Sequence, residues 1–230
     1  MAALILGCGT AVTSGDWQKL AASSGSRAVE TPATPGRKDV DPLVKGSEIG
    51  AEIDRLVVHG TDADLAAVVL RLMRLERLDI PVGFVPVGPG SDVARLWGLP
   101  ANPIEVALTG SVRPLPLIRD DAGGVLLGLG VLAPASGTVY CDDQLALRGA
   151  AERIEVAPDP GGQLTVRVVR RGFLRNKTTT LKGRAVQFGV DPVAPTRDGV
   201  AYPRPMERWT WYRHTEDLLC SAVVPARNER

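Results

Sequence analysis

The apolar residues of the first hundred positions follow two different spacings. Continuous apolar runs at Ala3–Leu6, Leu56–Val58 and Val82–Val87 are typical of strands buried on both faces of a parallel sheet. Between the last two runs, Asp62–Arg77 carries apolar residues three and four positions apart, which predicts a helix with Asp62 as its N-cap. This alternation of strand and helix predicts a doubly wound α/β domain.

The pattern changes after the first hundred residues. Short alternating stretches separated by Gly and Pro turns predict antiparallel strands there. Segment 31–47 is polar, contains three prolines and is expected to be a loop. We therefore predict an α+β two-domain chain, with an N-terminal α/β doubly wound domain followed by an antiparallel β-sandwich-like domain. The expected boundaries are 1–108 for the first domain, 109–224 for the second and 225–230 for a tail.

Composition narrows the class of protein further. The chain has 230 residues, of which 44% are hydrophobic and 23% charged, so it can bury a core without disulfides or metal. Its 27 basic and 26 acidic residues give a net charge of +1, which argues against nucleic acid as a partner. Cys8, Cys141 and Cys220 are far apart, which predicts no metal site and fits a reducing, cytoplasmic compartment.

Segment 80–100 contains the most informative motif, an apolar strand followed by the turn Gly88-Pro89-Gly90-Ser91-Asp92, then Ala94-Arg95 and Gly98-Leu99-Pro100. It resembles the diacylglycerol kinase family, which includes sphingosine kinases and bacterial lipid kinases. In that family an apolar strand precedes Pro-x-Gly-Thr-x-Asn-Asp-x-Ala-Arg and then Gly-Leu/Ile-Pro. The upstream family element, strand–Gly-Gly-Asp-Gly-Thr–helix, is expected about thirty residues earlier, where Val57–Ala63 precedes the predicted helix. The positions of segment 80–100 that fall in register are Pro86, Gly88, Gly90, Asp92, Ala94, Arg95, Gly98, Leu99 and Pro100.

The resemblance implies a nucleotide over the turn Gly88–Asp92 and a lipid against the β domain. It also implies ATP and Mg²⁺ as cofactors if the chain is active. Glycine turns can bind phosphate because their backbone N–H groups are not shielded by side chains. The residues that the resemblance assigns to cofactor binding are Gly60, Thr61, Asp62, Gly88, Gly90, Ser91 and Asp92.

The chain departs from the family at both acidic positions. His59 and Thr61 stand where the upstream family loop has Gly and Asp, although a shift of one residue would let Asp62 supply the carboxylate. In the β domain, Asp198-Gly199-Val200 keeps the Asp-Gly of a family Asp-Gly-Glu but lacks the Glu, which leaves Asp198 as the candidate base. General base catalysis is worth about 10²–10⁴ in rate. We therefore predict a catalytically degenerate diacylglycerol-kinase-like protein that acts as a nucleotide- or lipid-binding or scaffolding protein.

Other interpretations stay open. The chain could be an active ATP-dependent lipid kinase with relocated carboxylates, Asp62 or Asp64 for the metal and Asp198 for the base. The turn Gly88–Asp92 could equally be only a strand–turn–helix connection, since turns and helix starts commonly use these residue types. A lone His59 at a strand end is more often a packing or capping residue than a catalytic one.

Two segments suggest partners. Stretch 166–184 is basic, has no acidic residue and is centred on Phe173-Leu174, so it is either a solvated hairpin edge or a contact with a lipid or an inner membrane surface. A membrane contact would make the protein peripheral at the inner membrane face. Trp209 and Trp211 share one face of a predicted strand, as part of a core or as a surface for a protein partner or a homo-oligomer.

Overall fold

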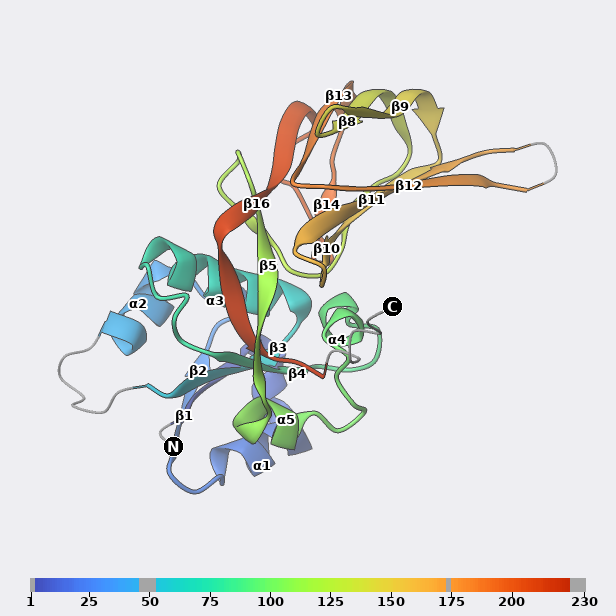
Figure 1. Ribbon diagram of the computed structural model, residues 1–230. Coiled ribbons are helices and arrows are strands. Elements are labelled where there is room, and N and C mark those ends of the chain that lie inside the picture. The colour runs from blue at the N-terminus through green and yellow to red at the C-terminus, as the bar shows by residue number, and fades with distance from the viewer. Residues whose placement is uncertain (1–2, 46–52, 173–174, 224–230) are drawn as a thin grey trace. The chain divides into compact units, whose positions relative to one another are not determined.

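The computed structural model describes residues 3–45, 53–172 and 175–223 (Figure 1). The predicted tail, 225–230, and the apolar pair Phe173-Leu174 lie outside the described residues. The chain forms two compact units. Unit 1 comprises Met1–Pro114 together with Leu218–Arg230, and unit 2 comprises Leu115–Asp217.

Unit 1 is built on a parallel sheet in the order β2-β1-β3-β4. Every residue of β1 and β3 is buried, because helices cover both faces of the sheet. Figure 1 shows α1 and α5 on one side of this sheet and α2 and α3 on the other. The strands are β1 (Ala3–Cys8), β2 (Ser26–Thr31), β3 (Arg55–Gly60) and β4 (Val82–Pro86).

The helices of unit 1 connect these strands. One layer of the core forms where Trp17 and Leu20 of α1 and Ala107 of α5 pack against Ile5 and Val57 of the sheet. The helical segments are η1 (Gly9–Thr13, a 3-10 helix), α1 (Gly15–Ala21), α2 (Arg37–Lys45), α3 (Asp62–Arg74), α4 (Asp92–Leu96) and α5 (Ile104–Thr109).

The structure corrects the prediction of a loop over 31–47, because α2 occupies part of this segment. Val40 and Val44 are buried and lie one helical turn apart. The buried carboxylate of Asp41 forms a bidentate ion pair with Arg71 of α3, at 2.8 and 2.9 Å. These tertiary contacts support a helix despite the cost of Pro42 in its interior.

Unit 2 consists of antiparallel strands in two sheets. In one, β16, β13, β8 and β9 are neighbours, and the other has the order β12-β11-β10-β7-β14-β15. A single apolar core contains residues of both sheets. The strands are β5 (Val112–Asp120), β6 (Val125–Leu126), β7 (Gly130–Leu132), β8 (Ala135–Cys141), β9 (Gln144–Ala151), β10 (Arg153–Asp159), β11 (Gln163–Arg170), β12 (Lys177–Gly183), β13 (Ala185–Val193), β14 (Thr196–Arg197), β15 (Val200–Ala201) and β16 (Met206–Ser221). The predicted fold class, α/β followed by antiparallel β, is confirmed.

The tryptophan pair of β16 is part of this core. Trp209 stacks on Phe188 with ring centroids 4.3 Å apart, and Trp211 meets both rings edge-on. Trp209 and Trp211 are 2% and 0% exposed. The hypothesis that they form a surface for a protein partner is therefore wrong, because their rings already fill the interior of unit 2.

The end of β16 belongs to unit 1, so that unit contains two separate segments of the chain. Cys220 pairs in parallel with Val82 of β4, at the open edge of the parallel sheet. The buried guanidinium of Arg55 donates to Ser221 Oγ and to the carbonyl oxygen of Gly110, the latter at 2.9 Å. The strand end thus completes the packing of unit 1.

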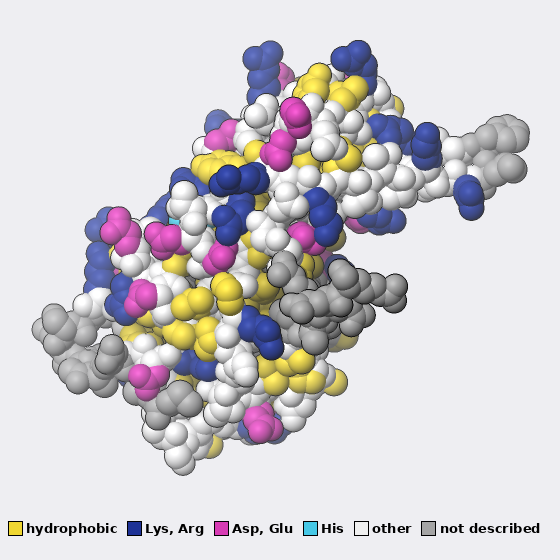
Figure 2. Space-filling model, viewed as in Figure 1, with side chains coloured by type: hydrophobic (Ala, Val, Ile, Leu, Met, Phe, Trp, Pro, Cys, Tyr) yellow, Lys and Arg dark blue, Asp and Glu magenta, His cyan; other side chains and the backbone are white. Residues whose placement is uncertain are grey.

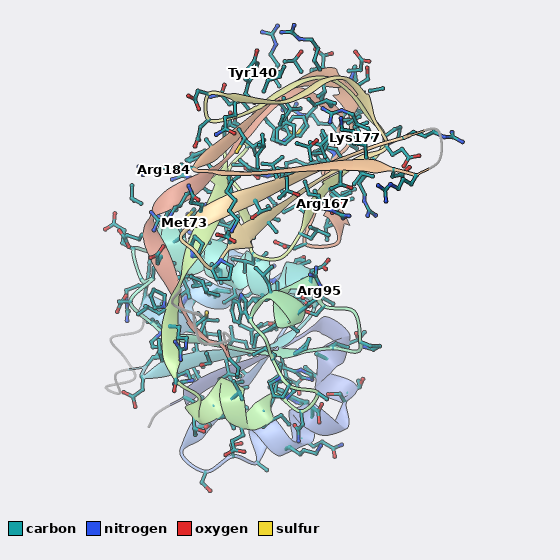
Figure 3. All side chains as sticks on the ribbon, turned by 45° about the vertical axis from the view of Figure 1, so that its right-hand side comes forward. Met73, Arg95, Tyr140, Arg167, Lys177 and Arg184 are labelled. Carbon is teal, nitrogen blue, oxygen red and sulfur yellow. The ribbon has the colours of Figure 1, made fainter. Side chains whose placement is uncertain are left out.

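The basic residues of stretch 166–184 lie on the hairpin formed by β11 and β12, where Figure 2 shows Lys and Arg side chains. Figure 3 labels Arg167 and Lys177 on its two strands. Acidic partners come from the neighbouring strand β10: Arg167 lies 2.7 Å from Glu155, and Lys182 lies 2.9 Å from Asp159. Among the described residues, no helix has the length and apolar character needed to cross a membrane.

Candidate functional site

The carboxyl ends of β1, β3 and β4 meet at one edge of the parallel sheet of unit 1. In open α/β sheets this edge is where ligands bind. Three connections lie there: η1 after β1, Thr61–Asp64 after β3, and Val87–Ser91 after β4. The last two are joined, since the backbone N–H of Val87 donates to the carbonyl oxygen of Gly60 at 2.9 Å. The structure therefore brings together all the residues of unit 1 that the sequence suggested for cofactor binding.

The loop after β3 is closed by a capping box. The Thr61 side chain accepts the backbone N–H of Asp64, and Asp64 Oδ2 accepts the Thr61 N–H at 2.8 Å and its hydroxyl at 2.8 Å. Asp64 Oδ1 accepts the N–H of Thr34 at 2.6 Å. At Gly60 a side chain would not fit, because a Cβ would lie 2.8 Å from Asp64 Oδ2. Gly60, Thr61 and Asp64 thus form one tightly packed turn.

The sequence suggested Asp62 as the N-cap of α3, but in the structure Thr61 has that position. Its carboxylate crosses instead to the start of α4. Asp62 Oδ1 accepts the Ser91 hydroxyl, and Oδ2 accepts the backbone N–H groups of Asp92 and Val93 at 2.8 and 3.2 Å. Burial raises the pKa of Asp62, and these hydrogen bonds oppose that increase. Asp62 therefore fixes one loop to the next.

The turn after β4 has a different character, because it is open to solvent. Val87, Gly88, Pro89 and Gly90 are exposed. Gly88 and Gly90 have φ values of 74° and 101°, in the left-handed region that favours glycine. A Cβ at either position would meet no atom within 4 Å, so the backbone of the turn is accessible from outside. Asp92, just beyond the turn, forms an exposed ion pair with Arg95 at 2.6 Å.

His59 is a buried packing residue. It is 1% exposed, and its Nδ1 donates to the carbonyl oxygen of Val85 at 2.8 Å. Because a carbonyl can only accept, Nδ1 carries a proton, and the other ring nitrogen, Nε2, forms a hydrogen bond with the Ser14 hydroxyl 2.7 Å away. Ser14 Oγ in turn accepts the N–H of Trp17 and caps α1. The ring therefore joins β3, β4 and the start of α1.

The carboxylates at this edge do not fit a magnesium site. Asp62 and Asp64 each accept three hydrogen bonds from the protein, out of about four lone-pair sites on a carboxylate. Over residues 3–45, 53–172 and 175–223, no group of three or more His, Cys, Asp and Glu side chains is placed to hold a metal ion. Asp142 and Asp143, a pair that could have suggested a metal, form the turn between β8 and β9.

Asp198, the candidate base, lies in unit 2 and shapes a hairpin. It follows β14 and, with Gly199, forms the two-residue turn to β15, where Arg197 pairs with Val200. Both turn residues have positive φ, 49° and 83°, as in the tight turns for which Asp-Gly is a strong signal. The Asp198 carboxylate is 4% exposed and accepts the backbone N–H groups of Leu127 and Gly128 at 3.0 and 2.7 Å.

Position 200, where the family has Glu, carries a valine that is 51% exposed. A valine cannot accept or donate a proton. The geometry of the turn therefore explains why Asp198-Gly199 is present. The position of the missing glutamate carries a side chain that cannot transfer a proton. The sequence held the signal for this hairpin, since Asp-Gly between short alternating stretches predicts a turn.

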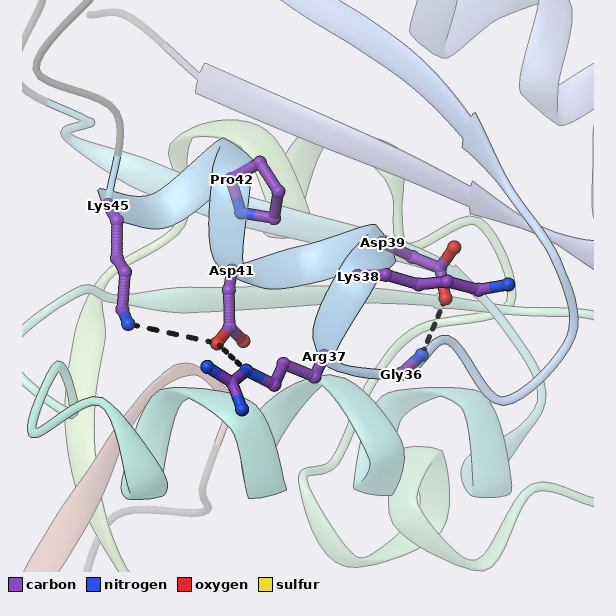
Figure 4. Close-up of a pocket in the computed structure, with 7 residues that line it drawn as sticks. All are labelled: Gly36, Arg37, Lys38, Asp39, Asp41, Pro42 and Lys45. Atoms are coloured by element: carbon purple, nitrogen blue, oxygen red, sulfur yellow. Dashed lines mark hydrogen bonds and ion pairs between the residues drawn. The ribbon is translucent and has the colours of Figure 1, made fainter.

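A pocket of about 610 Å³ lies beside α2 (Figure 4). Its cations are Arg37, Lys38 and Lys45. Asp41 lies 3.7 Å from Arg37 and 3.9 Å from Lys45, and Asp39 caps the backbone N–H of Gly36 at 2.9 Å. The pocket thus has three cations and two carboxylates, of which Asp41 is also held by Arg71 of α3.

Comparison with known proteins agrees with this architecture. A protein from Bacillus anthracis str. Sterne, described as "a putative diacylglycerol kinase", is 15% identical, with a TM-score of 0.68 over 97% of this chain and 98% of that one. An NAD kinase from Archaeoglobus fulgidus, solved in complex with ATP, is 13% identical, with a TM-score of 0.60 over 96% of this chain and 93% of that one. A search of curated proteins finds no match.

These likenesses show that the fold, an α/β unit with an antiparallel β unit, is shared with both proteins. The model of the diacylglycerol kinase catalytic domain matches residues 9–118, which include all three loops at the carboxyl edge of the sheet. Through this segment, which is somewhat less than half of the chain, the protein is similar to the diacylglycerol kinase catalytic domain.

Proposed function

We propose that this protein is a catalytically degenerate lipid-kinase homologue, which binds an adenine nucleotide at the turn Gly88–Ser91 and does not transfer its phosphate. One observation carries the proposal: the carboxylates of Asp62 and Asp64 are used to hold the loops together. Phosphoryl transfer depends on carboxylate-held metal ions and a positioned base. Asp198 is occupied by backbone N–H groups, and Val200 supplies no replacement.

Nucleotide binding is supported by the turn itself. Two glycines in the left-handed region, exposed and with space around them, allow a phosphate to approach the backbone N–H groups closely. The matched segment includes this turn, and the similar NAD kinase was solved with ATP. Since Asp62 and Asp64 are engaged, we expect ATP binding that does not require Mg²⁺.

A phosphorylation assay tests the loss of catalysis. The purified chain is incubated with radiolabelled ATP, Mg²⁺ and a diacylglycerol in mixed micelles, and the lipid fraction is counted. We expect no phosphorylated lipid above a reaction without protein. Turnover at an ordinary kinase rate, about 1–100 s⁻¹, would overturn the proposal. The Gly90→Val variant, prepared in parallel, is the control: the turnover counts only if this variant shows none. That result would favour an active lipid kinase with Asp62 or Asp64 at the metal.

Calorimetric titration with ATP, with and without Mg²⁺, tests the binding. We expect saturable binding to the wild type and at least tenfold weaker binding to Gly90→Val, because a β-branched residue is strained at φ 101°. Gly162→Val is the matched control, since Gly162 has φ 93° and open space but lies in unit 2. Absence of heat, together with absence of a thermal shift at high ATP, would refute nucleotide binding. Ligand at 100 times its Kd should stabilise the protein by about 2.7 kcal/mol.

A further inference from the structure

A second pocket, of about 800 Å³, lies entirely within unit 2. It lies between the β5–β6 turn and the segment that leads from β15 into β16. None of the cofactor-binding residues suggested by the sequence contributes to it. Its lining residues are Ala122, Gly123, Gly124, Arg197, Tyr202, Pro203, Arg204, Pro205, Met206, Glu207 and Arg208.

One wall of this pocket is rigid. Arg197 Nη1 lies 2.6 Å from Asp120 Oδ2, and the Asp120 side chain is fully buried. The guanidinium lies 5.0 Å from the centre of the Tyr202 ring, and the Tyr202 hydroxyl donates to the same carboxylate. Asp120 Oδ1 accepts the backbone N–H of Gly124 at 2.7 Å, where any Cβ would overlap the guanidinium. This network fixes the charge of Arg197 at the edge of the pocket.

Two further arginines give the pocket its unbalanced charge. Arg204 and Arg208 are exposed, and neither side chain makes a hydrogen bond or an ion pair with the residues that the structure describes. Arg204 stands between Pro203 and Pro205, which restricts its backbone. Glu207 is the one acidic side chain among the lining residues. With Asp120 committed to Arg197, Arg204 and Arg208 are left to face a ligand.

From this geometry we propose that the pocket binds a phosphate monoester, with the phosphoryl group between Arg204 and Arg208. A guanidinium presents its N–H groups as a planar fork that matches phosphate oxygens, and two such forks suit a dianion. Arg197, whose charge is balanced by Asp120, lines the same pocket at a fixed place. The phosphate is carried either by a soluble molecule or by a lipid headgroup. This inference does not depend on nucleotide binding in unit 1 or on the loss of catalysis.

Titration of the full chain with glycerol 3-phosphate tests the site, with inorganic phosphate as a second probe. We expect saturable binding that weakens at least tenfold in Arg204→Gln/Arg208→Gln. The matched control is Arg148→Gln/Arg184→Gln, which removes two exposed arginines of unit 2 outside the pocket. Gly90→Val should bind like the wild type, which separates this site from the turn in unit 1. Absence of saturable binding, or an equal loss in both double variants, would overturn the proposal.

Vesicles distinguish the two sources of the phosphate. Sedimentation is measured with phosphatidylcholine vesicles that contain phosphatidic acid. If the ligand is a lipid headgroup, binding falls in the pocket variant and soluble glycerol 3-phosphate competes with it. If the ligand is soluble, glycerol 3-phosphate binds and the vesicles do not. Vesicle binding that is equal in the wild type and the pocket variant, without binding of glycerol 3-phosphate, would refute the site.

Discussion

Asp62 shows how one side chain can determine what a loop does. Its carboxylate accepts the Ser91 hydroxyl and two backbone N–H groups at the start of α4, a position where an anion is favoured by the free N–H groups of the helix. In phosphoryl transfer, carboxylates must remain available to hold the metal ion that contacts the phosphates. Here the protein supplies both the anion and its donors, so the loop is stabilised without a ligand.

The raised pKa of Asp62 predicts a pH dependence of stability. A carboxyl with a raised pKa binds more protons in the folded than in the unfolded chain, so its contribution to the free energy of unfolding falls as pH rises. The fall begins near the unfolded value, about pH 3.9, and ends above the folded pKa. Asp62→Asn lacks this contribution, so its stability relative to wild type should increase over that interval. Urea unfolding at a series of pH values measures the difference, and a flat difference would contradict the assignment.

At the scale of elements, tertiary contacts decide both α2 and the core of unit 2. The α2 segment looks like a loop from its prolines and polarity, yet Val40, Val44 and the Asp41–Arg71 ion pair make it a helix. In β16, strict alternation places Trp209 and Trp211 on one face, and the sheet turns that face inward against Phe188. The same alternation is compatible with an exposed surface, so the sequence pattern alone could not choose between them.

Removal of the Trp211 ring should destabilise the protein strongly. The ring is fully buried, and Trp211→Ala would leave a large cavity, which typically costs about 3–5 kcal/mol. Tyr140→Ala is the control, because Tyr140 is 37% exposed on β8 and its loss should cost about 1 kcal/mol or less. Urea unfolding followed by far-ultraviolet circular dichroism gives both values. Similar small losses in the two variants would show that Trp211 is not part of the core.

At the scale of the whole molecule, the last described residues belong to the unit in which the chain begins. Cys220 pairs with Val82, and Ser221 accepts a hydrogen bond from Arg55. Burial lowers the pKa of the Arg55 guanidinium, which has carbonyl and hydroxyl acceptors around it. The packing of unit 1 therefore depends on Leu218–Ser221, a segment that follows unit 2 along the chain.

A chain that stops after Asp217 should lose protection in unit 1. Without Leu218–Ser221, Arg55 loses the Ser221 hydroxyl and β4 loses β16 as the neighbour on its second side, so we expect faster amide exchange in β3 and β4. Peptides from β10 and β11 should exchange as in the full chain, because these strands pair within unit 2. Hydrogen exchange with mass spectrometry reads both sets. Ser221→Ala keeps the strand and should show a smaller effect in the same peptides, and a uniform change across both units would contradict this account.

The sequence by itself determined the elements whose signal is local. Apolar runs specified the parallel strands, helical spacing specified α3, and the Gly88–Asp92 motif identified the family segment, because each depends on neighbours a few residues apart. These signals were enough for the fold class and for the residues at the edge of the sheet.

What only the tertiary structure decided is which groups remain available there. Asp62 meets Ser91 and Asp64 meets Thr34 across 29 and 30 residues of chain, and Asp198 meets Gly128 across 70. The same holds for Arg197, which meets Asp120 across 77 residues. An aspartate is the same residue in the sequence whether its carboxylate is free or hydrogen-bonded, so the sequence alone cannot show its partners. Those depend on loops that the folded chain brings together, because hydrogen bonding is decided by distance in space.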